Sequence, residues 1–238
     1  MIDLDGGLLH LDCAASARTD SVSRQLTGLF ARIWRERTGA GGYRYRDLAA
    51  DPVPLLGAAY VSLGQRVERH GAMPLPPERV AGMAQSERER REWALTLPLV
   101  TDLRTAGTVL LGVPMYNLTV PAAFKAWIDR VSFPGMYTDP GTGESLLRDT
   151  KIVVVMAQGG AYGPGTPREG YDFQTPYLRA YFGRLGVAGE NLHLVRAEMT
   201  RADDVPELAS FREYRDRSLA EAHAAVEHLA AGLCPAAR

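Results

Sequence analysis

The stretch Thr108-Val-Leu-Leu-Gly-Val-Pro-Met-Tyr-Asn117 decides the fold. Residues 108–113 form a continuous apolar run, which is typical of a strand covered by helices on both of its faces. Pro114 ends the run, and a tyrosine and an asparagine follow shortly after it. We therefore expect a central strand whose carboxyl end leads directly into a loop that carries polar groups.

Apolar runs on either side of this stretch predict further strands. Residues 8–11 and 151–157 have the same uninterrupted apolar character, and residues 192–195 form a shorter run. Residues 43–48 alternate tyrosine with arginine, as a strand with one buried face does. Apolar residues recur at helical spacing between the strands. This spacing predicts helices over residues 22–34, 57–69, 78–104, 124–131, 173–185 and 206–232, the third of them interrupted near Pro98.

Strands that alternate with helices indicate an α/β protein. We predict a doubly wound fold with a central parallel sheet and helices on both faces. In such sheets ligands bind beyond the carboxyl ends of the strands, so the loops at those ends should carry the function. A length of 238 residues favours a single domain that spans residues 1–238.

The composition argues against several classes of function. A formal net charge of -1 gives no electrostatic reason to bind nucleic acid or an anionic membrane. Cys13 and Cys234 are too few for a disulfide framework, the first residues are acidic where a signal peptide is basic, and no apolar run approaches the roughly twenty residues that cross a bilayer. The histidines lack ligand spacing and no G-x-S-x-G is present, so we expect neither a metal site nor a hydrolase. A cytoplasmic protein is predicted.

The loop after the first strand ends at a predicted helix N-terminus. Ser21, Val22 and Ser23 open that helix, where hydroxyls and free backbone N–H groups can bind a phosphate. Ser16 lies earlier in the same loop. Serine at a helix start is usually an N-cap, so capping is the simpler interpretation of this loop taken by itself. The loop contains no glycine, so the dinucleotide fingerprint G-x-G-x-x-G is absent.

The loops after the two central strands suit a planar ligand. Asn117 places an amide at the sheet edge, and a flavin ring edge needs both hydrogen-bond donors and acceptors. Gly159 and Gly160 allow close backbone approach, and their N–H groups could stabilise the negative charge at the N1–O2 edge of reduced flavin. A simple turn is the alternative interpretation of each loop.

The order and spacing of the three loops resemble one known family, the FMN-dependent NADH azoreductases and NAD(P)H quinone reductases. The resemblance covers nearly the whole chain, and Met-Tyr-Asn after a buried strand is its most specific element. The matching segments are Ser21-Val-Ser-Arg-Gln-Leu26, Arg46-Asp-Leu-Ala-Ala-Asp-Pro52, Pro114-Met-Tyr-Asn117, Lys125-Ala-Trp-Ile-Asp-Arg-Val131, Gly159-Gly160 and Thr175-Pro-Tyr-Leu178.

This resemblance implies a flavodoxin-like fold, one FMN per subunit, NADH or NADPH as electron donor, and a homodimer with each site near the subunit interface. Asn117 and Tyr116 are the candidate catalytic residues. The resemblance assigns the FMN phosphate to Ser16, Ser21, Val22 and Ser23, the isoalloxazine ring to Pro114, Met115, Tyr116, Asn117 and Leu118, and the pyrimidine edge to Gln158, Gly159 and Gly160.

The implied function is an FMN-dependent NAD(P)H oxidoreductase that passes two electrons by a ping-pong mechanism to a quinone, azo or related conjugated acceptor. Leu118 stands where the family usually has phenylalanine, and Gln158 where it has arginine, so the acceptor is left open. The alternatives are a specialised reductase of secondary metabolism acting on a conjugated carbonyl, imine or N–N substrate, a flavin reductase serving a monooxygenase, and a non-enzymatic electron carrier. Segment 57–107 is longer than usual. Arg18, Arg168 or Arg184 could meet the 2′-phosphate of NADPH, so the donor is also open.

Overall fold

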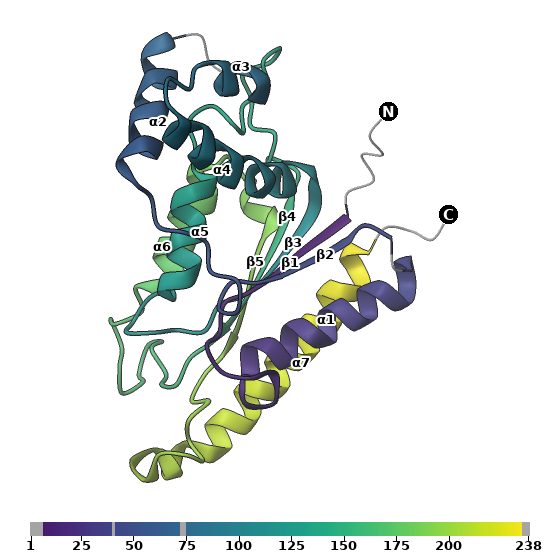
Figure 1. Ribbon diagram of the computed structural model, residues 1–238. Coiled ribbons are helices and arrows are strands. Elements are labelled where there is room, and N and C mark those ends of the chain that lie inside the picture. The colour runs from purple at the N-terminus through teal and green to yellow at the C-terminus, as the bar shows by residue number, and fades with distance from the viewer. Residues whose placement is uncertain (1–6, 40, 72–74, 235–238) are drawn as a thin grey trace.

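A computed structural model describes residues 7–39, 41–71 and 75–234 of the chain. Its centre is a parallel sheet of five strands in the order β2-β1-β3-β4-β5 (Figure 1). The order reverses between β1 and β3, as in a doubly wound fold. β3 lies in the middle, which confirms the prediction made from residues 108–113. The strands are β1 (Gly7–Asp12), β2 (Tyr43–Asp47), β3 (Ala106–Gly112), β4 (Lys151–Ala157) and β5 (Leu192–Ala197).

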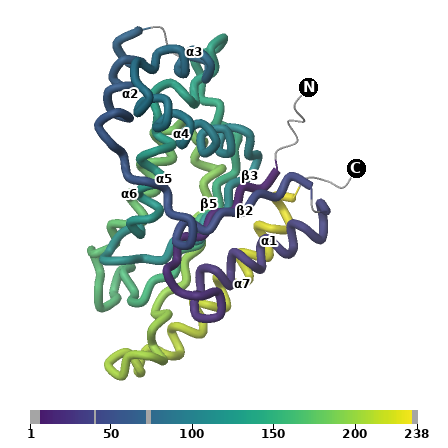
Figure 2. Tube along the Cα trace, in the orientation of Figure 1, coloured from purple at the N-terminus to yellow at the C-terminus, as the bar shows by residue number. Residues whose placement is uncertain are grey.

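Helices cover both faces of the sheet, as predicted. One face carries α1 (Val22–Thr38) and α7 (Arg212–Leu233), which lie side by side in Figures 1 and 2. The other face carries α4 (Glu87–Thr105), α5 (Ala122–Val131) and α6 (Gln174–Arg184), with α2 and α3 farther out against α4. The two outer helices are α2 (Ala58–His70) and α3 (Pro77–Gly82).

Helical spacing explains how α1 packs. Leu26, Phe30 and Trp34 follow one another at intervals of four residues, so they lie on one side of the helix. All three are buried in the apolar cluster that includes Val153 and Val155 of β4. Trp127 of α5 is buried in the cluster on the opposite face of the sheet. Both tryptophans are therefore core residues.

The helix predicted over residues 78–104 differs from the structure. The break lies at residues 83–86, between α3 and α4, and not near Pro98, through which α4 continues. Ser86 caps the new helix by accepting a hydrogen bond from the N–H of Glu89. Pro98 removes one intrahelical hydrogen bond, but the buried side chains that follow it, among them Leu103, hold the helix against the core.

The closing helix predicted from residue 206 begins as a 3-10 helix over Pro206–Phe211 and becomes α-helical only at Arg212. The proline-rich segment that follows α2 lies partly outside the described residues, because residues 72–74 are not described.

The buried guanidinium of Arg130 on α5 connects that helix to segment 57–107 and to the residues just before the segment. Arg130 is 0% exposed and donates to the backbone carbonyls of Pro54 and Leu55 and to the carboxylate of Glu92 on α4. The hydroxyl of Tyr60 on α2 donates to the carbonyls of residues 129 and 130. The extra length of the segment therefore packs as part of the domain that carries the site.

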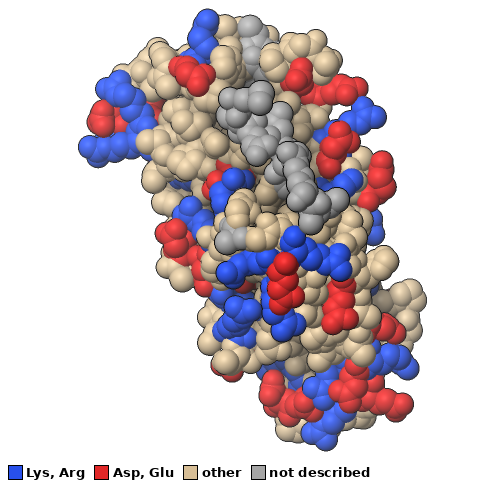
Figure 3. All heavy atoms as spheres, turned by 90° about the vertical axis from the view of Figure 1, so that its right-hand side faces the viewer, with Lys and Arg blue, Asp and Glu red and all other residues tan. Residues whose placement is uncertain are grey.

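Membrane-spanning helices and clusters of metal ligands are both absent from the described residues. No helix in them is both long and apolar enough to span a membrane. They also contain no group of three or more His, Cys, Asp or Glu placed to hold a metal ion. The face in Figure 3 mixes basic and acidic side chains, so no extended patch of one sign covers it.

Candidate active site

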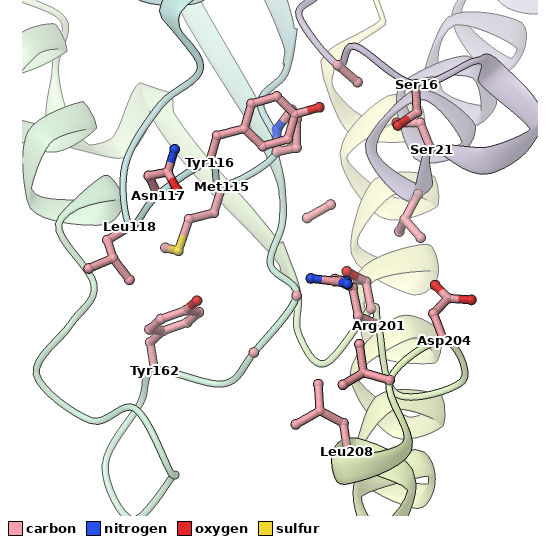
Figure 4. A pocket seen from close by; sticks show the side chains of 18 of the residues that line it. Ser16, Ser21, Met115, Tyr116, Asn117, Leu118, Tyr162, Arg201, Asp204 and Leu208 are labelled. Atoms are coloured by element: carbon pink, nitrogen blue, oxygen red, sulfur yellow. The ribbon is translucent and has the colours of Figure 1, made fainter.

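A cavity of about 800 Å³ opens at the carboxyl ends of β1, β3, β4 and β5, where the fold predicts a ligand site. Its walls come from loops that are far apart in the sequence. Figure 4 shows Met115, Tyr116, Asn117 and Leu118 on one side, with Ser16 and Ser21 across the cavity. The loop after β5 closes the remaining side.

The first wall is the start of α1. Ser21 is the N-cap, and its hydroxyl accepts a hydrogen bond from the N–H of Arg24. The N–H groups of Val22 and Ser23 lie in the first turn, where no intrahelical acceptor exists, and no other acceptor for them is found among the described residues. The positive end of the helix dipole lies at the same place. This wall combines capping with free donors for an anion.

Buried polar groups fix the base of that wall. The guanidinium of Arg24 donates to the carbonyl of Ala14 at 2.6 Å and pairs with the carboxylate of Asp47 at 2.7 and 2.8 Å. The hydrogen bond from Arg24 lowers the pKa of Asp47. Cys13 donates its thiol to the carbonyl of Gly112 at 2.9 Å, and burial raises the pKa of that thiol. Cys13 is thus a packed core residue and not a nucleophile.

The second wall is a strained turn after β3. Tyr116 and Thr119 exchange backbone hydrogen bonds of 3.0 and 3.2 Å around Asn117 and Leu118. Both central residues have positive φ, 48° and 74°, a combination typical of a type I′ turn. Leucine rarely adopts this conformation, and such strain is concentrated at functional sites. The hydroxyl of Tyr116 accepts from the N–H of Ala15 at 3.0 Å, which joins this wall to the first loop.

The third wall is the glycine pair after β4. A Cβ at Gly159 would lie 2.9 Å from the Cδ of Arg201, and one at Gly160 would lie 3.2 Å from the Cδ of Arg168. Because Gly159 and Gly160 have no side chains, Arg201 and Arg168 can pack against them without narrowing the cavity further. The guanidinium of Arg168 donates to the hydroxyl of Tyr162 at 3.3 Å and lies over its ring, which fixes this edge of the wall.

The structure brings most of the predicted residues together. Ten of them line the cavity: Ser16, Ser21, Val22, Pro114, Met115, Tyr116, Asn117, Leu118, Gly159 and Gly160. The side chains of Ser23 and Gln158 are fully buried and do not line it. Of the three arginines considered for NADPH, Arg168 lines it, whereas Arg18 lines a separate cavity beside β2 and Arg184 is exposed on α6.

The position of Gln158 has a local cause. Its N–H donates to the carbonyl of Ala197 and its carbonyl accepts from the N–H of Thr200, so the chain here continues the sheet between β4 and β5. The side chain consequently points inward, where its amide nitrogen donates to Gln174 at 3.2 Å. The amide of Gln174 in turn donates to the carbonyl of Val113. Gln158 thus supports the end of β3 from inside.

Sequence reasoning missed the wall formed by the loop after β5. Residues 199–205 carry no recognisable motif, and no candidate was named there. The general position of ligand sites in doubly wound sheets was the one available signal, since this loop also follows the carboxyl end of a strand. Apart from Arg168, the lining residues that were not predicted as site residues are Ala14, Asp20, Ala157, Tyr162, Thr200, Arg201, Asp204, Val205, Glu207 and Leu208.

Comparisons with known proteins agree with this geometry. A family model described as Flavodoxin-like fold matches residues 8–221. The FMN-dependent NADH:quinone oxidoreductase of Nocardia farcinica is 39% identical over 216 residues, which cover 90% of this chain and 93% of the relative. The protein of the same name from Frankia casuarinae is 40% identical over 219 residues, covering 92% of this chain and 95% of the relative.

A solved structure shares the fold. The crystal structure of an FMN-dependent NADH-azoreductase from Bacillus anthracis, in complex with FMN, superposes with a TM-score of 0.72 and covers 97% of this chain and 100% of its own. At 20% identity this likeness concerns the fold alone. The two sequence relatives identify the family more closely, because their identity of 39% and 40% extends over nearly the full length of both chains. The chain belongs to the flavodoxin-like family of FMN-dependent NADH:quinone oxidoreductases.

Proposed function

We propose that the cavity binds FMN and that the protein is an NADH-dependent quinone reductase. The observation that carries this proposal is the convergence of three walls on one cavity: a helix N-terminus with free donors, a strained turn, and a glycine pair. The helix N-terminus suits a phosphate, and the turn suits the edge of a planar ring. The glycine pair lets the backbone come close to that ring. The cavity volume lies within the range typical of cofactor sites.

The residues present fit the cofactor piece by piece. The N–H groups of Val22 and Ser23, with the hydroxyls of Ser16 and Ser21, would hold the phosphate. Residues 114–118 would line the ring, and the space beside Gly159 and Gly160, which a Cβ would reduce, would admit its pyrimidine edge. FMN bound there would supply the two-electron redox chemistry between NADH and a quinone.

The protein's own contribution is to bind and to orient. Asn117 and Tyr116 are the residues we assign to the reacting edge, and the turn that holds them is fixed by its own backbone hydrogen bonds and by Ala15. We propose a ping-pong cycle in which the donor and the acceptor would occupy this cavity in turn. Quinone is the proposed acceptor since the relatives in Nocardia and Frankia are named for it.

A pair of matched variants tests the site. Gly160→Val places a side chain in the cavity wall, whereas Gly183→Val puts the same side chain on α6, where a Cβ meets nothing within 4 Å. Titration of the apoprotein with FMN, followed by flavin fluorescence, should show binding that Gly160→Val weakens at least tenfold and Gly183→Val leaves within about twofold. Equal FMN affinity in both variants would contradict this placement of the ring.

We also propose a homodimer in the cytoplasm. Large apolar side chains are exposed at Leu55 (79%) and Val61 (46%) before and within α2, and at Tyr171 (57%) and Phe173 (54%) before α6. A partner subunit would cover side chains of this kind. The cytoplasm is proposed on a separate observation, since both cysteines are free, as they are in a reducing compartment. Light scattering should give twice the chain mass of 26.0 kDa, and Leu55→Arg should shift the mass toward that of one chain; a single-chain mass for the wild type would refute the dimer.

A further inference from the structure

The loop after β5 is fastened to the glycine pair. The N–H of Met199 donates to the carbonyl of Gly160 at 3.1 Å. The N–H and hydroxyl of Thr200 donate to the carbonyl of Gln158 at 3.0 and 3.1 Å. Met199 is buried and has a φ of 53°, so the chain bends sharply here and directs the next residues back over the cavity. The position of Arg201 relative to Gly159 is therefore set by the backbone.

Arg201 brings a positive charge to this part of the cavity. Its aliphatic stem packs against Gly159, and Figure 4 shows the guanidinium directed into the space between the loop walls. No carboxylate lies within 4.0 Å of it among the described residues, whereas Arg212 and Arg215 nearby pair with Asp203. The charge of Arg201 is available to whatever binds beside the glycine pair.

We propose that Arg201 stabilises the negative charge of reduced FMN at the pyrimidine edge and thereby sets the reduction potential of the cofactor. This inference rests on the proposed function. Transfer of a hydride from NADH to FMN forms one N–H bond at N5, releases NAD⁺, and leaves one negative charge near N1 and O2 when no further proton is taken up. A fixed cation beside that edge favours the reduced form over the oxidised form.

The reduction potential measures this preference directly. The shift in potential on binding is proportional to the logarithm of the ratio of the affinities for reduced and oxidised FMN, and a tenfold change in that ratio is about 30 mV for a two-electron couple. Replacement of the guanidinium by an uncharged group should therefore lower the potential of the holoprotein, with little change in its affinity for oxidised FMN.

Three variants of the holoprotein separate charge from bulk. Arg201→Met keeps the stem without the charge, Arg201→Lys keeps a charge, and Arg184→Met removes an exposed arginine of α6 as the control. Spectroelectrochemical titration should show the potential of Arg201→Met lowered by about 30 mV or more, the tenfold change expected above. Arg201→Lys should recover most of the shift, and Arg184→Met should match the wild type.

The measurements distinguish a failure of the role proposed for Arg201 from a failure of FMN binding. A potential in Arg201→Met that equals that of the wild type overturns the role of Arg201 and leaves FMN binding intact. An unchanged potential combined with a raised KM for NADH would instead place Arg201 on the donor. A wild-type protein that takes up no FMN refutes the proposed function, and this inference with it.

Discussion

Replacement of Arg130 by methionine should destabilise the protein strongly. The residue is 0% exposed, and its guanidinium donates to the carbonyl of Pro54 at 3.1 and 3.0 Å, to that of Leu55 at 3.2 Å, and to the carboxylate of Glu92 at 2.8 Å. Methionine has a similar length and fills the space, but it donates nothing. Arg130→Met thus leaves the Glu92 carboxylate without its counterion and these carbonyls without their donor.

The size of the loss follows from the burial of the partners. Removing one member of a buried ion pair typically costs about 3–5 kcal/mol. The side chain of Glu92 keeps 20% of its surface exposed, so water can solvate part of its charge and the lower end of the range applies. We expect a loss of about 3 kcal/mol from a domain whose total stability is of the order of 5–15 kcal/mol.

Urea unfolding of the apoprotein, followed by circular dichroism, measures this loss. Arg91→Met is the matched control, because Arg91 lies on α4 with its side chain 76% exposed and pairs with Glu87 only at the surface. That variant should lose at most about 0.5 kcal/mol. Arg130 does not line the cavity, so FMN stoichiometry should be unchanged in both. A loss below about 1 kcal/mol in Arg130→Met would refute the reasoning.

Three further predictions concern the N-cap of α1, the ion pair between Arg24 and Asp47, and the cysteines. Ser21→Ala removes the N-cap of α1 and should cost about 1 kcal/mol in urea unfolding, while also weakening FMN binding; unchanged FMN affinity would exclude Ser21 from the phosphate site. The pKa of Asp47 is lowered by Arg24, so this pair stabilises the fold above the unfolded-state pKa and the stabilisation is lost as pH falls through the folded-state pKa. Asp47→Asn should therefore lose less stability than the wild type between about pH 6 and about pH 3, and parallel pH profiles would contradict this linkage. Burial raises the pKa of Cys13, so a thiol reagent should modify the less buried Cys234 first; a fast phase that survives Cys234→Ser would show that Cys13 is accessible.

Periodicity in the sequence was sufficient to predict the fold. An uninterrupted apolar run such as residues 108–113 has few outcomes other than a buried strand, and helical spacing such as that of Leu26, Phe30 and Trp34 leaves one side to be buried. The break assigned near Pro98 was wrong. Whether a proline ends a helix depends on how firmly the following turn is packed, and that packing involves residues distant in the sequence.

The candidate site was predictable where a local pattern marks it. Serines at a helix start, Asn117 after a strand and the glycine pair each have a recognisable form. Arg201 has none, because its place in the cavity results from hydrogen bonds between the loop after β5 and residues 158–160. The inward orientation of Gln158 likewise depends on the sheet continuing past β4. Both positions are set by contacts between strands and could not be read from local sequence.

An anaerobic spectroscopic titration of the purified protein reconstituted with FMN tests the central claim most directly. The account predicts one FMN bound per chain, full bleaching of the flavin absorbance by one equivalent of NADH, and full return of the absorbance on addition of one equivalent of a quinone. A protein that binds no flavin after incubation with excess FMN, or a bound flavin that NADH leaves oxidised, would contradict it.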